Sequence, residues 1–159
     1  MNVTVTVNDK SLNRLAHTFP IRIDRGIARI AYTAEKEAVR NAPVLMGSLR
    51  SSIGVLRVFE GAYLVFVNAR SSGTGGGAPY DAFQELGTGL HAETFDGQAV
   101  GTRHRIYPRK AKLLVFEWKG RTWHLPSVEG VKPVHYMRAG RDAAIAQAQV
   151  KFNEGFMSL

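Results

Sequence analysis

The stretch Pro20–Asn41, PIRIDRGIARIAYTAEKEAVRN, carries the strongest structural signal in the chain. Its apolar side chains recur at steps of three and four residues: Ile23, Ile27, Ile30, Ala31, Ala34 and Ala38. This spacing predicts an amphipathic helix of about five or six turns. Ala42-Pro43 predicts its end, because a residue before proline disfavours the helical conformation. Upstream, Asp9 or Ser11 can cap a short first helical piece, but Pro20 and Gly26 interrupt the pattern, so we expect the regular helix to start late.

The side of this helix opposite the apolar stripe is basic. At about 100° per residue, five cations gather there: Arg22, Arg25, Arg29, Lys36 and Arg40. We call these five residues the basic ridge. A solvated helix face opposite the core explains such a ridge equally well, so the sequence leaves open whether it contacts a partner.

The remainder of the chain predicts strands, a shorter helix and a C-terminal helix. A period of two over 3–7 indicates a short strand. Two hairpins are expected, one from Leu49–Phe59 and Ala62–Val67 and one from Ile106–Trp118 and Arg121–Leu125. Helices are expected over Tyr80–Leu86, ended by Gly87, and over about Tyr136–Phe156, where Ala139, Ala143, Ala146 and Val150 mark a face of small residues.

Together these elements predict an α+β fold, with a mainly antiparallel sheet and both a long N-terminal-half helix and a C-terminal helix packed on one face. Residues 1–159 read as a single domain, because neither repeats nor a shift in composition divide them. Long loops are expected at about 70–79 and 89–105, and we predict that they are assembly elements.

Composition argues against several classes of protein. The chain has no cysteine, which excludes a disulfide scaffold, cysteine-ligated zinc, an iron–sulfur cluster and a thiol nucleophile. Its five histidines lack metal-ligand spacing, and neither a G-x-S-x-G element nor a phosphate-binding GK[ST] loop is present. We therefore expect no enzyme, no catalytic residue, no metal and no cofactor. No apolar run approaches the roughly 18 residues of a membrane helix, and the first residues do not resemble a secretory signal.

The charge is compatible with an anionic partner, although a solvated, positively charged surface without a partner would explain it as well. Lysine and arginine number 21 against 13 acidic residues, a net charge of +8 with a pI near 10.1. Nucleic acid, a membrane surface and an acidic protein would all suit such a chain. Glu85 is the most notable acid, and we expect it to accept a hydrogen bond from a loop amide or to pair with an arginine.

Four segments, in order, resemble the signatures of a family of neck or tail-completion proteins of long-tailed bacteriophages. Asn41–Ile53 resembles APVDTGxLRxSI, and Tyr80–Thr88 resembles YAxxxExGT. Ile106–Phe116 is similar to IxPKxAKxLxF, and Val131–Gly140 to PxPFLxxA. The matching residues are Pro43, Gly47, Leu49, Arg50, Ser52, Ile53, Tyr80, Glu85, Gly87, Thr88, Pro108, Lys110, Ala111, Lys112, Phe116, Pro133 and Ala139. Leu45-Met46 and Tyr136-Met137 depart from the pattern, which has Asp-Thr and Phe-Leu there.

The resemblance implies a non-enzymatic virion protein, made in the host cytoplasm, that forms a homo-oligomeric ring at the head–tail junction. It implies six subunits as the ring number. The implied partners are head-completion or connector proteins, tail terminator or tail-tube proteins, and the genomic double-stranded DNA in the lumen, bound without sequence specificity and without a membrane. The basic ridge would then face the DNA lumen or a partner ring. The alternative is a free basic nucleic-acid-binding module, although the chain shows neither a helix-turn-helix nor an aromatic RNA-binding strand motif.

Overall fold

The computed structural model describes residues 9–44, 48–69, 80–95, 98–99, 104–118 and 120–158. The α+β class and the antiparallel pairing are as the sequence predicts. The elements, in chain order, are α1 (Asp9–Asn41), α2 (Ser48–Ser51), β1 (Ile53–Phe59), β2 (Ala62–Val67), α3 (Tyr80–Leu86), the 3-10 helix η1 (Gly89–His91), β3 (Thr94–Phe95), β4 (Gln98–Ala99), β5 (Leu114–Trp118), β6 (Arg121–Leu125) and α4 (Tyr136–Met157).

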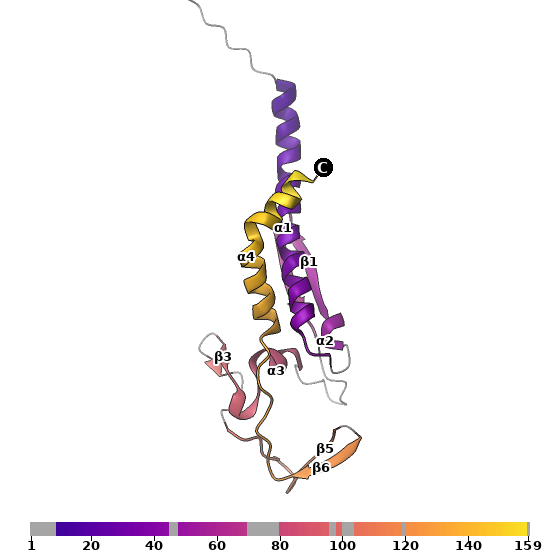
Figure 1. Ribbon diagram of the computed structural model, residues 1–159, viewed down its shortest axis with the longest axis vertical. Coiled ribbons are helices and arrows are strands. Elements are labelled where there is room, and N and C mark those ends of the chain that lie inside the picture. The colour runs from indigo at the N-terminus through magenta and orange to yellow at the C-terminus, as the bar shows by residue number, and fades with distance from the viewer. Residues whose placement is uncertain are drawn as a thin grey trace, which may run out of the picture.

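The two long helices α1 and α4 lie side by side, and the β1–β2 hairpin also packs against α1 (Figure 1). Small residues let the helix backbones approach closely. A Cβ atom built on Gly140 would lie 2.5 Å from the carbonyl oxygen of Ala34, and one on Gly155 would lie 2.5 Å from that of Arg25. The small-residue face predicted for α4 is therefore wrong, because the helix is rotated so that other residues face α1. The buried residues are Tyr136, Gly140, Ala144 and Gly155, whereas Ala146 and Val150 are exposed.

Helix α1 starts earlier than expected, because Pro20 lies inside it rather than before it. Proline removes one backbone hydrogen bond, but its fixed φ is close to the helical value. Pro20 is exposed, as is Ala16, whose carbonyl would have accepted the missing bond, so water can satisfy that oxygen. Gly26 is a packing position and not a break. A Cβ atom there would lie 2.5 Å from a ring carbon of Phe152 in α4.

The strands form three separate two-stranded sheets within the described residues, rather than one sheet. In the first, Ile53 pairs with Val67 and Leu56 with Leu64. Residues 48–51 form α2 instead of the start of β1, and β5 begins at Leu114 rather than at Ile106. The predicted loop at 89–105 contains η1, β3 and β4, while the expected strand at 3–7 and the loop at 70–79 lie outside the described residues.

The main buried cluster is small and lies where the C-terminal end of α1 meets the start of α4 and the start of β1. Its members are Ala38, Ala42, Leu49, Ile53, Ala69 and Tyr136. The cluster draws on residues far apart in the chain, so it holds together the ends of the helices and the open end of the β1–β2 hairpin.

The other end of the β1–β2 hairpin is tied to the middle of α1 by Asp24. One carboxylate oxygen of Asp24 accepts a hydrogen bond of 2.8 Å from the backbone amide of Gly61, in the hairpin turn. The other accepts a 3.0 Å bond from the Tyr63 hydroxyl and lies 3.1 Å from the Arg57 guanidinium. The Gly61 amide above all, and then Tyr63 and Arg57, lower the pKa of Asp24, against an opposing effect of desolvation.

The Asp24 tie predicts an acid-sensitive stability. Because the pKa of Asp24 is lowered in the folded state from its ordinary value of 3.8, its contribution is complete above pH 3.8 and is lost as the pH falls through the lower folded value. We expect the difference in melting temperature between wild type and D24N to be largest at pH 6 and to shrink as the pH falls from 4 to 2. A difference that stays constant across this range would show that the ionised carboxylate does not stabilise the fold.

Candidate assembly surface

The start of α4 is capped by a side chain from α3, that of Glu85. Its two carboxylate oxygens accept hydrogen bonds from the backbone amides of Met137 (2.8 Å) and Arg138 (3.0 Å). These amides are among those without a partner inside the helix, and a negative charge at a helix N-terminus is favourable. Glu85 thus accepts hydrogen bonds from backbone amides, but these belong to the start of a helix and not to a loop as expected.

Thr88, just after α3, is hydrogen-bonded to Val131, in the segment that leads into α4, and so strengthens the junction between these two helices. The Thr88 amide donates to the Val131 carbonyl (2.9 Å), and the Val131 amide donates to the Thr88 hydroxyl (2.9 Å). Gly87 has φ of +73°, and a Cβ atom there would lie 2.6 Å from the carbonyl oxygen of His91. Glycine is therefore required at this turn. In the segment that leads into α4, Pro133 is half-buried, and the backbone amide of the next residue, Val134, donates to the Gln84 carbonyl at 2.8 Å.

The first motif lies against the C-terminal end of α1. Arg50 donates through Nε to the Ala42 carbonyl (2.9 Å) and through Nη2 to the Arg40 carbonyl (3.3 Å). Ser52 donates to the Leu49 carbonyl at 2.8 Å. Leu49 and Ile53 belong to the buried cluster, and Pro43 is half-buried just before them in the chain. Ala139, which belongs to the fourth motif, is half-buried in α4. Gly47 lies outside the described residues, and of Tyr80 only its place at the start of α3 is described.

The third motif does not join this junction. Ala111 and the two lysines Lys110 and Lys112 are exposed before β5, whereas Pro108 and Phe116 are half-buried. The β5–β6 hairpin lies at the opposite end of the molecule from the start of α1 (Figure 1). The first, second and fourth motifs thus build the junction between α1, α3 and α4, and the third motif leads into a separate hairpin.

The β1–β2 hairpin has an outer face that is apolar and open to solvent. Its inner face packs on α1, whereas Leu56, Leu64 and Phe66 point the other way and are 53%, 51% and 39% exposed. Val58, at the β-bulge between Arg57 and Phe59, is also open to solvent and is 56% exposed. We call these four residues the outer hairpin face. An antiparallel sheet with one solvated face normally carries polar residues on that face. Sequence reasoning missed this face, although the unbroken apolar run Ala62–Val67 is typical of a strand covered on both sides.

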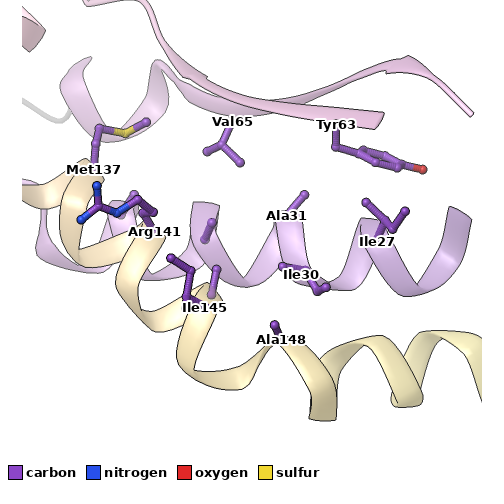
Figure 2. Close-up of a pocket in the computed structure, with 12 residues that line it drawn as sticks. Ile27, Ile30, Ala31, Tyr63, Val65, Met137, Arg141, Ile145 and Ala148 are labelled. Atoms are coloured by element: carbon purple, nitrogen blue, oxygen red, sulfur yellow. The ribbon is translucent and has the colours of Figure 1, made fainter. Parts of the chain in front are cut away.

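An apolar groove lies on the inner side of the same hairpin, between α1, α4 and β2. Ile27 and Ile30 of α1, Val65 of β2 and Ile145 of α4 lie around it (Figure 2), and its volume is about 430 Å³. Its size suits a small ligand, but its lining is almost entirely hydrocarbon, apart from Arg141 and the Tyr63 hydroxyl bound to Asp24. Such a lining suits an apolar side chain and offers little for acid–base chemistry.

The structure divides the basic ridge into two parts. Arg22 places its guanidinium carbon 5.8 Å from the centre of the Phe156 ring, and Arg25 donates to the Ser158 carbonyl at 2.7 Å. These two arginines contact the C-terminal end of α4. The other three members, Arg29, Lys36 and Arg40, are exposed, and Arg40 lies 3.7 Å from the Glu37 carboxylate. The role of the ridge at a lumen or a partner ring stays a prediction.

Within the described residues, no group of three or more histidine, aspartate or glutamate side chains is placed to hold a metal ion. Over the same residues, no helix is both long and apolar enough to span a membrane. Comparison of the chain with models of known protein families, with curated proteins and with solved structures gives no match.

Proposed function

We propose that this chain is a structural subunit that assembles with copies of itself into a ring, most simply a hexamer, at the head–tail junction of a tailed bacteriophage. The resemblance of four ordered motifs to neck and tail-completion proteins supports this function. Its partners would be head-completion or connector proteins on one side and tail terminator or tail-tube proteins on the other. Genomic DNA would pass through the ring.

The proposal of self-assembly rests on the exposure of the outer hairpin face. Burying a half-exposed leucine, valine or phenylalanine contributes roughly 1 kcal/mol, so the four side chains together supply about 4 kcal/mol. Association costs about 4–15 kcal/mol in lost freedom, so this face must be one part of a larger interface. A further exposed apolar side chain, that of Phe59 in β1, is available to extend it.

A second copy of the chain is the occupant that fits best. The outer hairpin face carries no charge, and a subunit with an apolar sheet face is kept soluble when each copy in a closed ring covers that of its neighbour. A free nucleic-acid-binding module is the alternative function, but phosphate groups would gain nothing from four hydrocarbon side chains.

We expect the double variant L56T/L64T to lose self-association. Wild type at about 50 μM should give a mass by light scattering several times that of the 17.5 kDa chain, and the variant should give the monomer mass. Both side chains are more than half exposed in one chain, so the far-UV circular dichroism should be unchanged. V150T, which alters an equally exposed apolar residue of α4, is the control and should assemble normally.

Two results would count against the proposal. Either the wild-type chain remains a monomer at 100 μM, or L56T/L64T assembles as well as V150T. In phage particles, an antibody against the chain should label the neck, and labelling elsewhere would refute the assigned location even if a ring forms.

A further inference from the structure

The positive charge of this chain is concentrated in one segment, residues 104–125, which we call the basic arm. It contains six cations, Arg105, Arg109, Lys110, Lys112, Lys119 and Arg121, and a single acid, Glu117, for a net charge of +5. The rest of the chain has 15 cations and 12 acids, a net charge of only +3. More than half of the net charge thus lies on 22 residues that include β5 and β6.

Four cations of the basic arm are open to solvent and form no ion pair within the described residues. Arg109, Lys110, Lys112 and Arg121 are all exposed. Within the described part of the chain, the ion pair found for the arm joins Arg105 to Glu129 at 3.4 Å, and none is found for those four. Neighbouring like charges repel one another, so a segment with this composition is most stable against an anionic surface.

The arm also stands apart from the rest of the fold. β5 and β6 pair with each other and make no other extensive contact among the described elements. Figure 1 shows their hairpin at one end of the molecule, away from the α1–α4 pair. Two aromatic side chains, Tyr107 and Trp123, are exposed on this segment. An isolated two-stranded hairpin is marginally stable in water, which favours a role in contact with another body.

We infer that the basic arm binds the phosphate backbone of double-stranded DNA, and that it, rather than the basic ridge of α1, is the main DNA-contacting surface. The inference rests on the proposed ring only for the place of the DNA in the lumen. An acidic protein is less suitable as the partner, because lysine is depleted from protein–protein interfaces and the arm carries three lysines. Contacts to phosphate position DNA without reading its sequence, as a DNA passage requires.

The chain offers two matched triple variants for a test. R109Q/K112Q/R121Q removes two arginines and one lysine from the arm, and R29Q/K36Q/R40Q removes the same types from the ridge. All six side chains are exposed, so either variant should keep its fold. Binding of the full-length chain to a fluorescent 20-base-pair duplex is measured by anisotropy between 50 and 200 mM salt.

We expect the arm variant to bind the duplex at least tenfold more weakly at 100 mM salt. The slope of log affinity against log salt is negative, and its magnitude should decrease by about 2.7, because each of the three lost phosphate contacts removes about 0.9. The ridge variant should bind within threefold of wild type. Equal losses in both variants, or an arm variant that binds like wild type, would overturn the inference.

Two further measurements separate the arm from other roles. Wild type should bind poly-glutamate at least tenfold more weakly than DNA at the same salt, and equal binding would assign the arm to an acidic protein surface. The arm variant should keep the wild-type mass in light scattering, and a change in mass would instead assign the arm to the subunit interface. A monomeric wild type with an arm-specific loss of DNA binding would remove the ring proposal and leave the arm inference standing.

Discussion

Replacing Tyr136 with alanine is expected to lower the free energy of unfolding by about 3–5 kcal/mol, the usual cost of deleting a large aromatic side chain from a core. Tyr136 is 0% exposed and is the first residue of α4. It packs in the buried cluster with Leu49 and Ile53, so its removal leaves a cavity where α1, α4 and the hairpin meet. Urea unfolding at low protein concentration measures the change.

The matched control for this prediction is Y136F. The hydroxyl of Tyr136 donates a long hydrogen bond, 3.4 Å, to the Asp81 carbonyl. Burial above all, with the charges of Asp81 and Glu85, raises the pKa of this phenol, so the hydroxyl stays a neutral donor. Its loss should cost no more than about 1 kcal/mol. If Y136A were as stable as Y136F, the cluster would not be the centre of the fold.

The second large effect is expected from Gly140→Val, which should lower the free energy of unfolding by about 3 kcal/mol. In an exposed helix, replacing glycine usually stabilises. Here the new Cβ atom would lie 2.5 Å from the Ala34 carbonyl oxygen and 3.0 Å from the Ala38 Cβ atom. The Ala34 oxygen belongs to the α1 backbone and cannot rotate away, so the two helices must separate.

The exposed Ala146 of α4 provides the control for the Gly140 prediction. A146V adds the same β-branched side chain to the same helix without meeting α1, and its effect should stay below about 1 kcal/mol. Thermal melts of both variants would test the close approach of the helices. Equal melting temperatures for G140V and A146V would contradict it.

Local patterns made α1, α3, α4 and the two longer hairpins predictable, because periodicity and turn residues act over a few positions, but they missed α2, η1 and the short β3–β4 hairpin. The three- and four-residue steps from Ile23 to Ala38 and the Gly87 helix end correspond to observed features. Long-range packing could not be read in this way. The rotation of α4 depends on the approach of Gly140 to Ala34, and the hairpin position depends on Asp24 reaching Gly61, 37 residues away.

The candidate site was predictable to a similar extent. The sequence predicts that Glu85 accepts a hydrogen bond from a loop amide or pairs with an arginine. It does not indicate that the donor is the Met137 amide at the start of α4, 52 residues away. The solvent exposure of Leu56 and Leu64 did not follow, since the sequence cannot tell a covered strand face from an open one. The charge of the basic arm follows from the sequence, whereas its separation from the α1–α4 pair does not, and helical periodicity indicates only the ridge.

If a second copy of the chain covers the outer hairpin face, position 58 should become inaccessible to reagents in solution, and this is the most direct test. The chain has no cysteine, so V58C carries a single thiol, whose alkylation rate can be followed as the protein concentration rises. We expect the rate to fall at least tenfold as the mass by light scattering increases, while a thiol at the exposed Gln149 of α4 stays reactive. An unchanged rate at position 58 in the assembled protein, or a chain that remains a monomer throughout, would contradict self-assembly through this face.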